Sequence, residues 1–288
     1  MPRYGMFCQD VAIFLSRLAR REVFDLVITS PPYNIGKEYE GRVPLQDYLD
    51  WQKKIIGEIV PRLRKRGSIC WQVGNFVENG VIEPLDIWLH PLFKANGLHL
   101  RNRIIWHFGH GLHCQQRFSG RYETVLWYTK SDEYIFNLDD VRIQSKYPGK
   151  RHYKGPYSGK LSSNPSGKNP EDVWEFATDI WNIPNVKGNH KEKTSHPCQF
   201  PVGLVERLIL GLSNKRGLVF DPFAGVGSAG VAAALHSRDF WGCEVVKDYV
   251  TKAKNRIDAA LKGEAVYRPH DQPLYDHRRS PLSVRPAE

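Results

Sequence analysis

The sequence has no long apolar run. No stretch approaches the roughly 20 consecutive apolar residues of a membrane-spanning helix, and the first residues, MPRYGMFCQD, lack the apolar core of a signal peptide. Cysteines are few and odd in number, 5 in 288 residues, and form no C-x-x-C pair. This argues against a disulfide framework, a zinc site and a dithiol redox motif. We therefore expect reduced thiols, no metal, no membrane contact and a cytoplasmic location.

Acidic residues are outnumbered by basic ones. The 41 Lys and Arg against 31 Asp and Glu give a formal net charge of +10, which favours a polyanionic partner through phosphate contacts and counterion release. A merely basic protein would show the same balance, so charge alone does not name the partner. Hydrophobic residues make up 41% of the chain, which is enough to bury one large core with a smaller embedded module.

Apolar runs alternate with helical patterns along the chain. Leu26–Ile28, Ser68–Val73 and Gly217–Phe220 end in turn-forming residues and are typical of buried parallel strands. The segment 47–67 has helical spacing and a closing glycine, which predicts a crossover helix between the first two strands. Further strands are expected at 98–109, 121–131 and 239–244, and further helices at 201–213 and 228–237. The alternation predicts an α/β fold.

Composition changes sharply after residue 138. The stretch KYPGKRHYKGPYSGKLSSNPSGKNP is rich in Lys, Arg, Gly, Pro, Ser and Tyr and has almost no aliphatic residues. A solvated linker would have this composition, and so would a surface whose basic side chains and tyrosines contact phosphates and stack on bases. We divide the chain into two halves of one domain, 1–138 and 181–262, an insertion at 139–180, and a proline-rich, charged tail at 263–288 that we expect to be disordered.

A glycine-rich turn, DPFAGVGSAG, follows the third strand. Gly225 and Gly227 allow a backbone to approach a ligand closely, although helix packing alone would also explain them. The spacing is not the dinucleotide G-x-G-x-x-G, and no P-loop lysine follows. Glu244 ends a strand about 20 residues further on, where nucleotide-binding α/β folds often place an acidic residue that accepts hydrogen bonds from ribose hydroxyls. An exposed acid at a helix start is the alternative.

A second turn, TSPPY, follows the first strand. Pro31 and Pro32 fix a rigid backbone and remove two N–H donors, which leaves carbonyls and the Ser30 hydroxyl as acceptors. Tyr33 offers a flat ring on which a base can stack. A purely structural turn would share these features.

Together, TSPPY and DPFAGVG resemble the paired signature of amino DNA methyltransferases, the N4-cytosine and N6-adenine families. RNRIIWHFG and RFSGRYETVLWYTK are similar to the family motif near the target-base pocket, and HPCQFP at 196–201 is similar to the HP-x-Q-x-P element beside the cofactor. The catalytic loop precedes the cofactor turn, which is the order of the circularly permuted β group. The resemblance covers residues 8–258 and departs from the pattern at Phe200, where the family often has lysine.

The resemblance implies an S-adenosylmethionine-dependent methyltransferase fold: a Rossmann-like, mainly parallel, seven-stranded sheet, circularly permuted, with a target-recognition insertion. Residues 1–138 would form the catalytic half and 181–262 the cofactor-binding half. The Ser30 hydroxyl and the Pro31 carbonyl would accept the amino hydrogens of a flipped base, while Tyr33 stacks on it. The amine would attack the methyl group in line, with Ser30, Pro31, Pro32 and Tyr33 as the catalytic residues. Serine at this position resembles the cytosine-N4 members, and N6-adenine is the alternative.

By the same resemblance, S-adenosyl-L-methionine would lie over the glycine-rich turn. The predicted cofactor-binding residues are Asp10, Thr29, Thr194, Ser195, Asp221, Pro222, Phe223, Ala224, Gly225, Gly227 and Glu244. Thr194 and Ser195 would equally serve as caps of the following helix, and we assign Trp51 to packing. The predicted DNA-binding residues are Arg117, Arg121, Arg142, Lys146, Lys150, Arg151, Lys154 and Lys160.

The expected partner is double-stranded DNA, bound by a monomer or homodimer, with any restriction endonuclease on a separate chain. Methylation of an RNA base or a protein side chain is one alternative. A catalytically idle nucleic-acid-binding protein is another, and the intact Ser30, Pro31, Tyr33, Gly225 and Gly227 argue against it.

Overall fold

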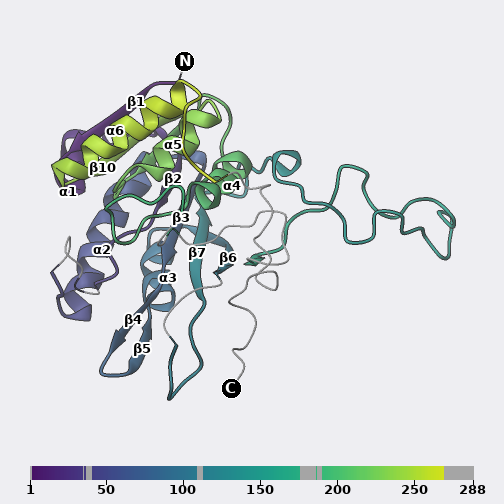
Figure 1. Cartoon of the computed structure of the whole chain (residues 1–288), viewed down its shortest axis with the longest axis horizontal. Coiled ribbons are helices and arrows are strands. Elements are labelled where there is room, and N and C mark those ends of the chain that lie inside the picture. Colours follow the sequence, from purple (N-terminus) through teal and green to yellow (C-terminus); the bar gives the residue numbers. More distant parts are fainter. Residues whose placement is uncertain are drawn as a thin grey trace, which may run out of the picture.

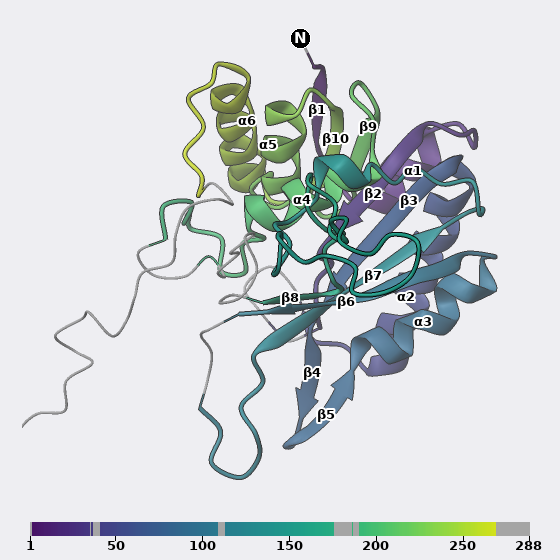
Figure 2. The same ribbon diagram turned by 90° about the vertical axis from the view of Figure 1, so that its right-hand side faces the viewer.

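A twisted sheet with helices on both faces forms the centre of the computed structural model, which describes residues 2–34, 36, 41–108, 113–175, 186 and 190–268 (Figures 1 and 2). In spatial order its strands are β1 (Tyr4–Cys8), β10 (Asp239–Glu244), β9 (Leu218–Asp221), β2 (Phe24–Thr29), β3 (Leu63–Val73), β7 (Tyr122–Thr129), β6 (His99–His107) and β8 (Val173–Glu175). The helices are α1 (Val11–Arg17), α2 (Leu45–Ile59), α3 (Leu85–Ala95), α4 (Val202–Leu212), α5 (Ser228–Leu235) and α6 (Lys247–Leu261), with 3-10 turns η1 (Val60–Arg62) and η2 (Leu138–Asp140). A separate hairpin consists of β4 (Asn75–Glu78) and β5 (Val81–Pro84).

The sheet is mainly parallel, as predicted. The run β1-β10-β9-β2-β3 is parallel throughout, and β7 lies antiparallel between β3 and β6. The described residues include an eighth strand, β8, beyond the seven predicted. It belongs to the predicted insertion and pairs with Ile105–His107 of β6, so the carboxyl end of β6 is not left as an open sheet edge.

The predicted helix at 47–67 is too long. Helix α2 ends at Ile59, and β3 begins at Leu63 after the turn η1. Pro61 lacks an N–H and fixes its own φ, so it cannot continue a helix. Gly67 lies inside β3 instead of closing the helix, and a Cβ there would come within 3.0 Å of the Asp25 carbonyl oxygen on β2.

The core has two layers, one on each face of the sheet. Side chains alternate along β2, so that Leu26 and Ile28 pack against α4, α5 and α6 while Val27 packs against α1, α2 and α3. Continuous burial on both faces explains why the central strands appear in the sequence as unbroken apolar runs. Among the described residues, no helix combines the length and apolarity that crossing a membrane requires.

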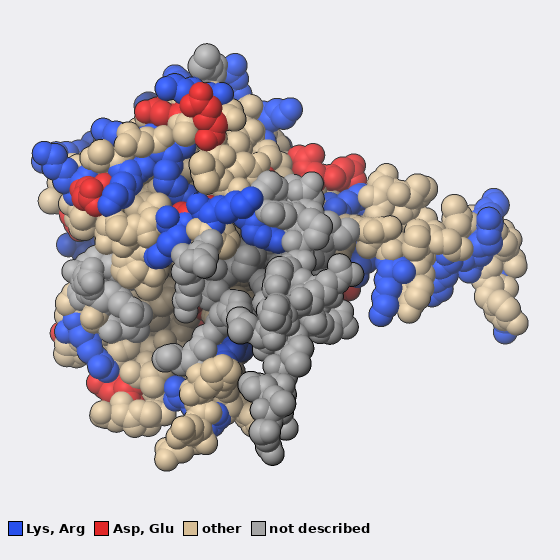
Figure 3. Space-filling view, viewed as in Figure 1, with Lys and Arg blue, Asp and Glu red and all other residues tan. Residues whose placement is uncertain are grey.

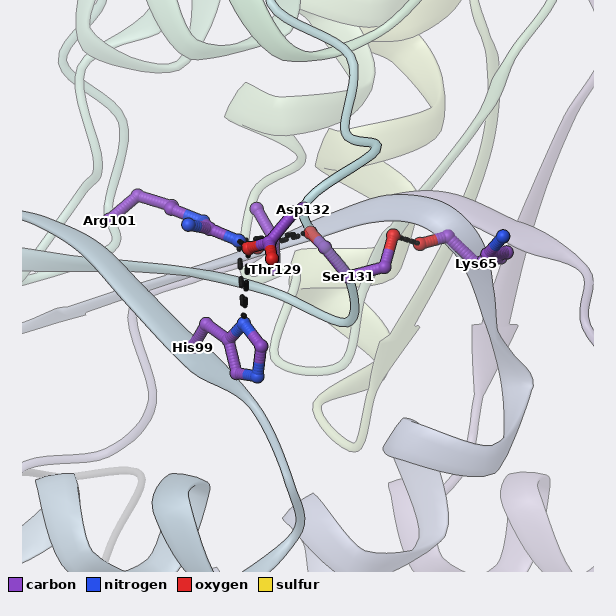
Figure 4. Close-up of polar contacts among 6 residues, drawn as sticks. All are labelled: Lys65, His99, Arg101, Thr129, Ser131 and Asp132. Atoms are coloured by element: carbon purple, nitrogen blue, oxygen red, sulfur yellow. Dashed lines mark hydrogen bonds and ion pairs between the residues drawn. The ribbon is translucent and has the colours of Figure 1, made fainter.

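The amino ends of β3 and β6 are joined by a polar network (Figure 4). Arg101 of β6 donates to Thr129 Oγ1 at 2.7 Å and to Asp132 Oδ1 at 2.5 Å. Ser131 Oγ donates to the Lys65 carbonyl oxygen on β3 at 2.9 Å. These bonds fix the turn after β7 to both neighbouring strands, at the edge opposite the carboxyl ends of the parallel strands.

The part of the predicted insertion between Ile143 and Lys168 projects from the body as a long arm (Figure 1). Its two sides are joined by isolated bridges between Ile143 and Lys168 and between Arg151 and Leu161. Of the predicted tail, Ala265 packs against the core beside α6, and residues 269–288 lie outside the described part of the chain. The expected disorder of that segment stays a prediction.

Candidate active site

A cavity of about 500 Å³ lies at the carboxyl ends of the parallel strands, within the range of about 300–1,000 Å³ that is usual for ligand pockets. Strands β2 and β9 are neighbours in the sheet, so the turns that follow them, far apart in sequence, face the same space. The predicted residues that line the cavity are Asp10, Ser30, Pro31, Pro32, Tyr33, Asp221, Pro222, Phe223, Ala224, Gly225 and Glu244.

The Ser30 hydroxyl belongs to a short chain of hydrogen bonds. Its Oγ lies 2.9 Å from Tyr33 Oη, which donates to Glu123 Oε2 at 3.4 Å. Gln72 Nε2 donates to the same Glu123 oxygen. Burial, with the Glu123 carboxylate nearby, raises the pKa of Tyr33 well above its ordinary value. Since Tyr33 therefore stays protonated and donates to Glu123, the Ser30 hydroxyl can donate to Tyr33 Oη and keep its own lone pairs as acceptors.

The rest of the TSPPY turn is fixed by α2 and by the segment that leads into it. Tyr48 Oη donates to the Pro32 carbonyl oxygen at 3.0 Å. Asn34, buried and at a φ of +61°, donates to the Val43 carbonyl at 2.7 Å and accepts from the Val43 N–H at 2.8 Å. Asparagine tolerates this left-handed conformation better than most residues. The turn is thus held before any ligand binds.

Asp221 begins the second turn and is only 3% exposed. Its Oδ1 accepts hydrogen bonds from Thr29 Oγ1 at 2.6 Å and from the Phe223 N–H at 3.0 Å. Burial raises the pKa of Asp221 to about 7, and the nearby Glu244 adds to the shift. Thr29 does not line the cavity. It lies behind Asp221 and joins β2 to the glycine-rich turn.

Glu244 is oriented by two backbone donors. The Gly225 N–H donates to Oε2 at 3.1 Å, and the Val246 N–H donates to Oε1 at 2.8 Å. Each oxygen retains a further lone pair for a ligand hydroxyl. Gly225 has a φ of +50°, and a Cβ there would come within 3.3 Å of His196 Nε2, so a side chain would crowd the cavity wall.

Gly227 was predicted to bind the cofactor with Gly225, but it lies away from the cavity. It does not line the cavity but precedes α5 at a φ of +78°, and a Cβ there would lie 2.8 Å from the Ala253 Cβ of α6. Asp10 both lines the cavity and caps α1, accepting from the Ala12 N–H at 2.8 Å.

Thr194 and Ser195 neither line the cavity nor cap α4. Thr194 Oγ1 donates to Gln199 Oε1 at 2.9 Å, and Ser195 Oγ accepts from Lys252 Nζ at 2.5 Å. The first backbone N–H of α4 donates instead to Glu192 Oε2 at 3.0 Å.

Aromatic residues that were not predicted as site residues complete the cavity. Trp51, which we assigned to packing, lines it with its ring 5.3 Å from that of Phe223. His196 and Tyr249 also line it, their rings 4.7 Å apart, and burial lowers the pKa of His196 to about 4. The HPCQFP motif could have indicated His196, but nothing local marks Trp51 or Tyr249, which lie on helices. Phe200 places an apolar ring in the cavity wall where the family often has lysine.

Most of the predicted DNA-binding residues lie on the arm, along which Lys and Arg side chains gather (Figure 3). Residues 141–170 contain no acidic side chain. The arm tyrosines 147, 153 and 157 are 64%, 88% and 60% exposed, and a lysine Nζ lies 5.6–5.8 Å from the centre of each ring. Arg142 differs, because its guanidinium is bonded to Asp139 and to the Gly167 carbonyl at the root of the arm. Arg117 and Arg121 lie instead in the loop between β6 and β7.

A model of the N6/N4 DNA methylase family matches residues 24–255. The chain is 47% identical over 227 residues to type II methyltransferase M.BglII of Bacillus subtilis, covering 78% of this chain and 61% of that relative. It is 35% identical over 248 residues to type II methyltransferase M.ScaI of Streptomyces caespitosus, covering 83% and 76%. DNA adenine methyltransferase YhdJ of Escherichia coli is 29% identical over 244 residues, covering 83% and 78%.

Solved structures share the fold. The PvuII DNA methyltransferase (cytosine-N4-specific) matches with a TM-score of 0.67 and 20% identity, over 93% of this chain and 95% of that one. TTHA0409 of Thermus thermophilus, solved in complex with S-adenosyl-L-methionine, matches with a TM-score of 0.63 and 23% identity, over 91% and 96%. From the family match and the relatives, this chain belongs to the N6/N4 DNA methylase family.

Proposed function

We propose that this protein transfers a methyl group from S-adenosylmethionine to the N4 amino group of a cytosine that it flips out of duplex DNA. The observation that carries the proposal is the shared cavity: the acceptor-rich Ser30 turn and the turn beside Glu244 face each other across it. A methyl donor and a methyl acceptor must meet within bonding reach, and one cavity lined by both turns supplies that arrangement.

The cavity fits the proposed cofactor. Glu244 has lone pairs available for ribose hydroxyls, and Trp51 and Phe223 provide an apolar wall for an adenine ring. Gly225 leaves the backbone open to close approach. When bound, S-adenosylmethionine supplies an electrophilic methyl group on its sulfonium. The complex of TTHA0409 with this compound supports the assignment.

The protein's part in the reaction is to orient the base. A nucleobase amino nitrogen is a poor nucleophile because its lone pair is delocalised into the ring, so acceptors must hold its hydrogens and aim it. Ser30 Oγ is one acceptor. Because Tyr48 already bonds the Pro32 carbonyl, we assign the second role to the Pro31 carbonyl. Positioning then supplies most of the acceleration, with no covalent enzyme intermediate.

Cytosine is proposed on the strength of Ser30 and of the PvuII structure, which is described as cytosine-N4-specific. Adenine N6 is the second candidate, because YhdJ is described as a DNA adenine methyltransferase. Two relatives are type II methyltransferases, which supports a role in restriction–modification, with any partner endonuclease on a separate chain.

Identification of the methylated nucleoside tests the proposal. The protein is incubated with S-adenosylmethionine labelled in its methyl group and with mixed-sequence duplex DNA, and the digested nucleosides are separated and weighed by mass spectrometry. Labelled N4-methylcytosine is the expected product. Labelled N6-methyladenine would show that adenine is the target base and would leave the proposed methyl transfer to an amino group intact. Labelled 5-methylcytosine, or label on RNA or peptide but not on DNA, would refute the proposal.

A further inference from the structure

The loop between β6 and β7 presents a fully exposed aromatic ring. Its described part, 113–121, includes Phe118, whose relative exposure is 101%. The exposed tyrosines of the arm each have a hydroxyl and a nearby lysine, whereas Phe118 has no polar atom in its side chain. Singly exposed apolar side chains are common on protein surfaces, so exposure alone does not mark a site. The bracing of this loop, its place in the fold and its arginines give the ring its interest.

The loop that holds this ring is braced. The Phe108 N–H donates to the Arg121 carbonyl at 2.8 Å and closes its base. The Cys114 N–H donates to Ser119 Oγ at 3.0 Å, across the turn that contains Phe118. Arg117 donates to the Gly80 carbonyl at 3.1 Å, which joins the loop to the β4–β5 hairpin. The loop and the hairpin project from the same end of the molecule (Figure 2).

The loop also leaves the sheet at the edge where the cavity lies. Strand β6 is parallel to β3 and β2, through β7, so the loop after β6 leaves the sheet at the same edge as the TSPPY turn. The loop returns into β7, where Glu123 accepts the hydrogen bond from Tyr33 Oη. Only four residues separate Phe118 from Glu123 in sequence. The loop that contains the exposed ring therefore leads directly into β7, the strand whose Glu123 contacts the catalytic turn.

The charges of the loop itself suit a nucleic acid. Arg117 and Arg121 flank Phe118, and residues 113–122 contain no acidic side chain. Arginine side chains commonly contact phosphate oxygens and so fix the register of a protein on a duplex. Apolar side chains that enter a duplex are commonly Phe, Leu, Ile, Met or Pro, and they unstack one base step at a cost of a few kcal/mol.

We propose that Phe118 is a wedge that enters the base stack at the step left vacant by the flipped base, with Arg117 and Arg121 on the adjoining phosphates. The proposal rests on the base flipping proposed above. The ring replaces the stacking that the departing base loses, so it stabilises the flipped state without touching the reacting atoms.

The test compares two duplexes that contain a methylated site mapped by sequencing DNA treated with the wild-type protein. One has an intact base pair at the target, and the other has an abasic position opposite the target base, which lowers the cost of flipping. Phe118→Ala should slow transfer to the paired duplex by about 10- to 100-fold, since unstacking costs a few kcal/mol. The same variant should approach the wild-type rate on the duplex with the abasic position.

Two further variants make the result specific to the ring. Phe118→Trp keeps a stacking surface and should retain transfer to the paired duplex. Ile87→Ala removes an apolar side chain that is 61% exposed on α3 and should behave as wild type on both duplexes. 2-Aminopurine at the target position should brighten on binding wild-type protein and much less on binding Phe118→Ala.

Wild-type rates for Phe118→Ala on the paired duplex would overturn the wedge. An equally slowed transfer on both duplexes, with unchanged 2-aminopurine brightening, would also overturn the wedge. Phe118 would then contact DNA without assisting base flipping. No methylation of DNA at all would instead refute the proposed function.

Discussion

Asp221 is a buried carboxyl group with an unusual proton affinity. Burial raises its pKa from 3.8 to about 7, so the folded protein holds this proton more tightly than the unfolded chain. The contribution to stability is complete below the unfolded pKa and is lost as the pH rises through about 7. Ionisation of Asp221 thus opposes folding in the neutral range, at the turn proposed to hold the cofactor.

Asp221→Asn should flatten the pH dependence of stability between about 4 and 7. The amide oxygen can still accept from Thr29 Oγ1 and the Phe223 N–H, and the side chain can no longer ionise. The free energy of unfolding in urea, measured at several pH values, checks this. Asp50→Asn removes an exposed carboxyl group on α2 and serves as the control for the change in charge. An unaltered slope in Asp221→Asn would contradict the role assigned to its burial.

At the level of single residues, the sequence indicates those that local motifs bring to the cavity. The positions of Ser30 and Glu244 on its wall could be predicted because a rigid proline turn and a strand-end acid have recognisable spacing. Glu123 and Gln72 could not, because their link to Tyr33 depends on how β3 and β7 pair. Gly227 was predicted from the same motif as Gly225, but only the packing of α6 distinguishes their places.

Helix α5 is held tightly between the sheet and α6. Gly227, just before the helix, has a φ of +78° and faces Ala253, so both backbone conformation and space favour glycine there. Gly263 has the same φ of +78°, but nothing lies within 4 Å of a Cβ added to it. A comparison of the two positions therefore distinguishes the cost of backbone strain, which both share, from the cost of steric overlap, which only Gly227 has.

Gly227→Ala should therefore destabilise the protein more than Gly263→Ala. Both substitutions cost about 1 kcal/mol for the left-handed conformation, and the overlap with Ala253 adds about 1–3 kcal/mol at Gly227 alone. Denaturation midpoints of the two variants, each compared with wild type, give the difference. Equal destabilisation would mean that α6 moves aside freely.

An element can be predicted from the sequence when local residues determine it, and not when contacts with distant segments do. Leu26–Ile28 are fully buried, as are Val219 and Phe220 of β9, so a short apolar run is sufficient evidence for a strand. The boundary between α2 and β3 was misplaced because basic residues 64–66 extend the helical pattern, whereas Pro61 and pairing with β2 determine the strand. Strand β8 has only three residues, and its pairing with β6 is a tertiary contact that no local pattern records.

The molecule as a whole combines a compact body with a basic arm. The sequence left open whether the 139–180 segment is a solvated linker or a surface for phosphates. In the structure, the arm holds its lysines beside exposed tyrosine rings. This arrangement favours contact with a nucleic acid, which we treat as a prediction.

Combined Lys146→Ala, Lys154→Ala and Lys160→Ala should weaken DNA binding and reduce its dependence on salt. The slope of log K against log salt concentration is negative, and each lost phosphate contact reduces its magnitude by about 0.9. Fluorescence anisotropy of labelled duplex DNA at several salt concentrations measures this slope. A control with Lys53, Lys54 and Lys262 replaced by alanine removes the same charge from exposed positions on α2 and just after α6. Equal slopes in the two triple variants would mean that the arm does not contact phosphates and is a solvated linker.

The central claim is that the two distant turns act across one cavity, with Ser30 serving the methyl acceptor and not the donor. The most direct test is the single-turnover rate of methyl transfer to DNA by Ser30→Ala, measured beside its affinity for S-adenosylmethionine by calorimetry. Ser16→Ala, at an exposed position on α1, is the control. Loss of a transition-state hydrogen-bond partner should slow transfer by about 100- to 1,000-fold while cofactor affinity stays at the wild-type value. Wild-type transfer by Ser30→Ala, or a loss explained entirely by weaker cofactor binding, would contradict the account.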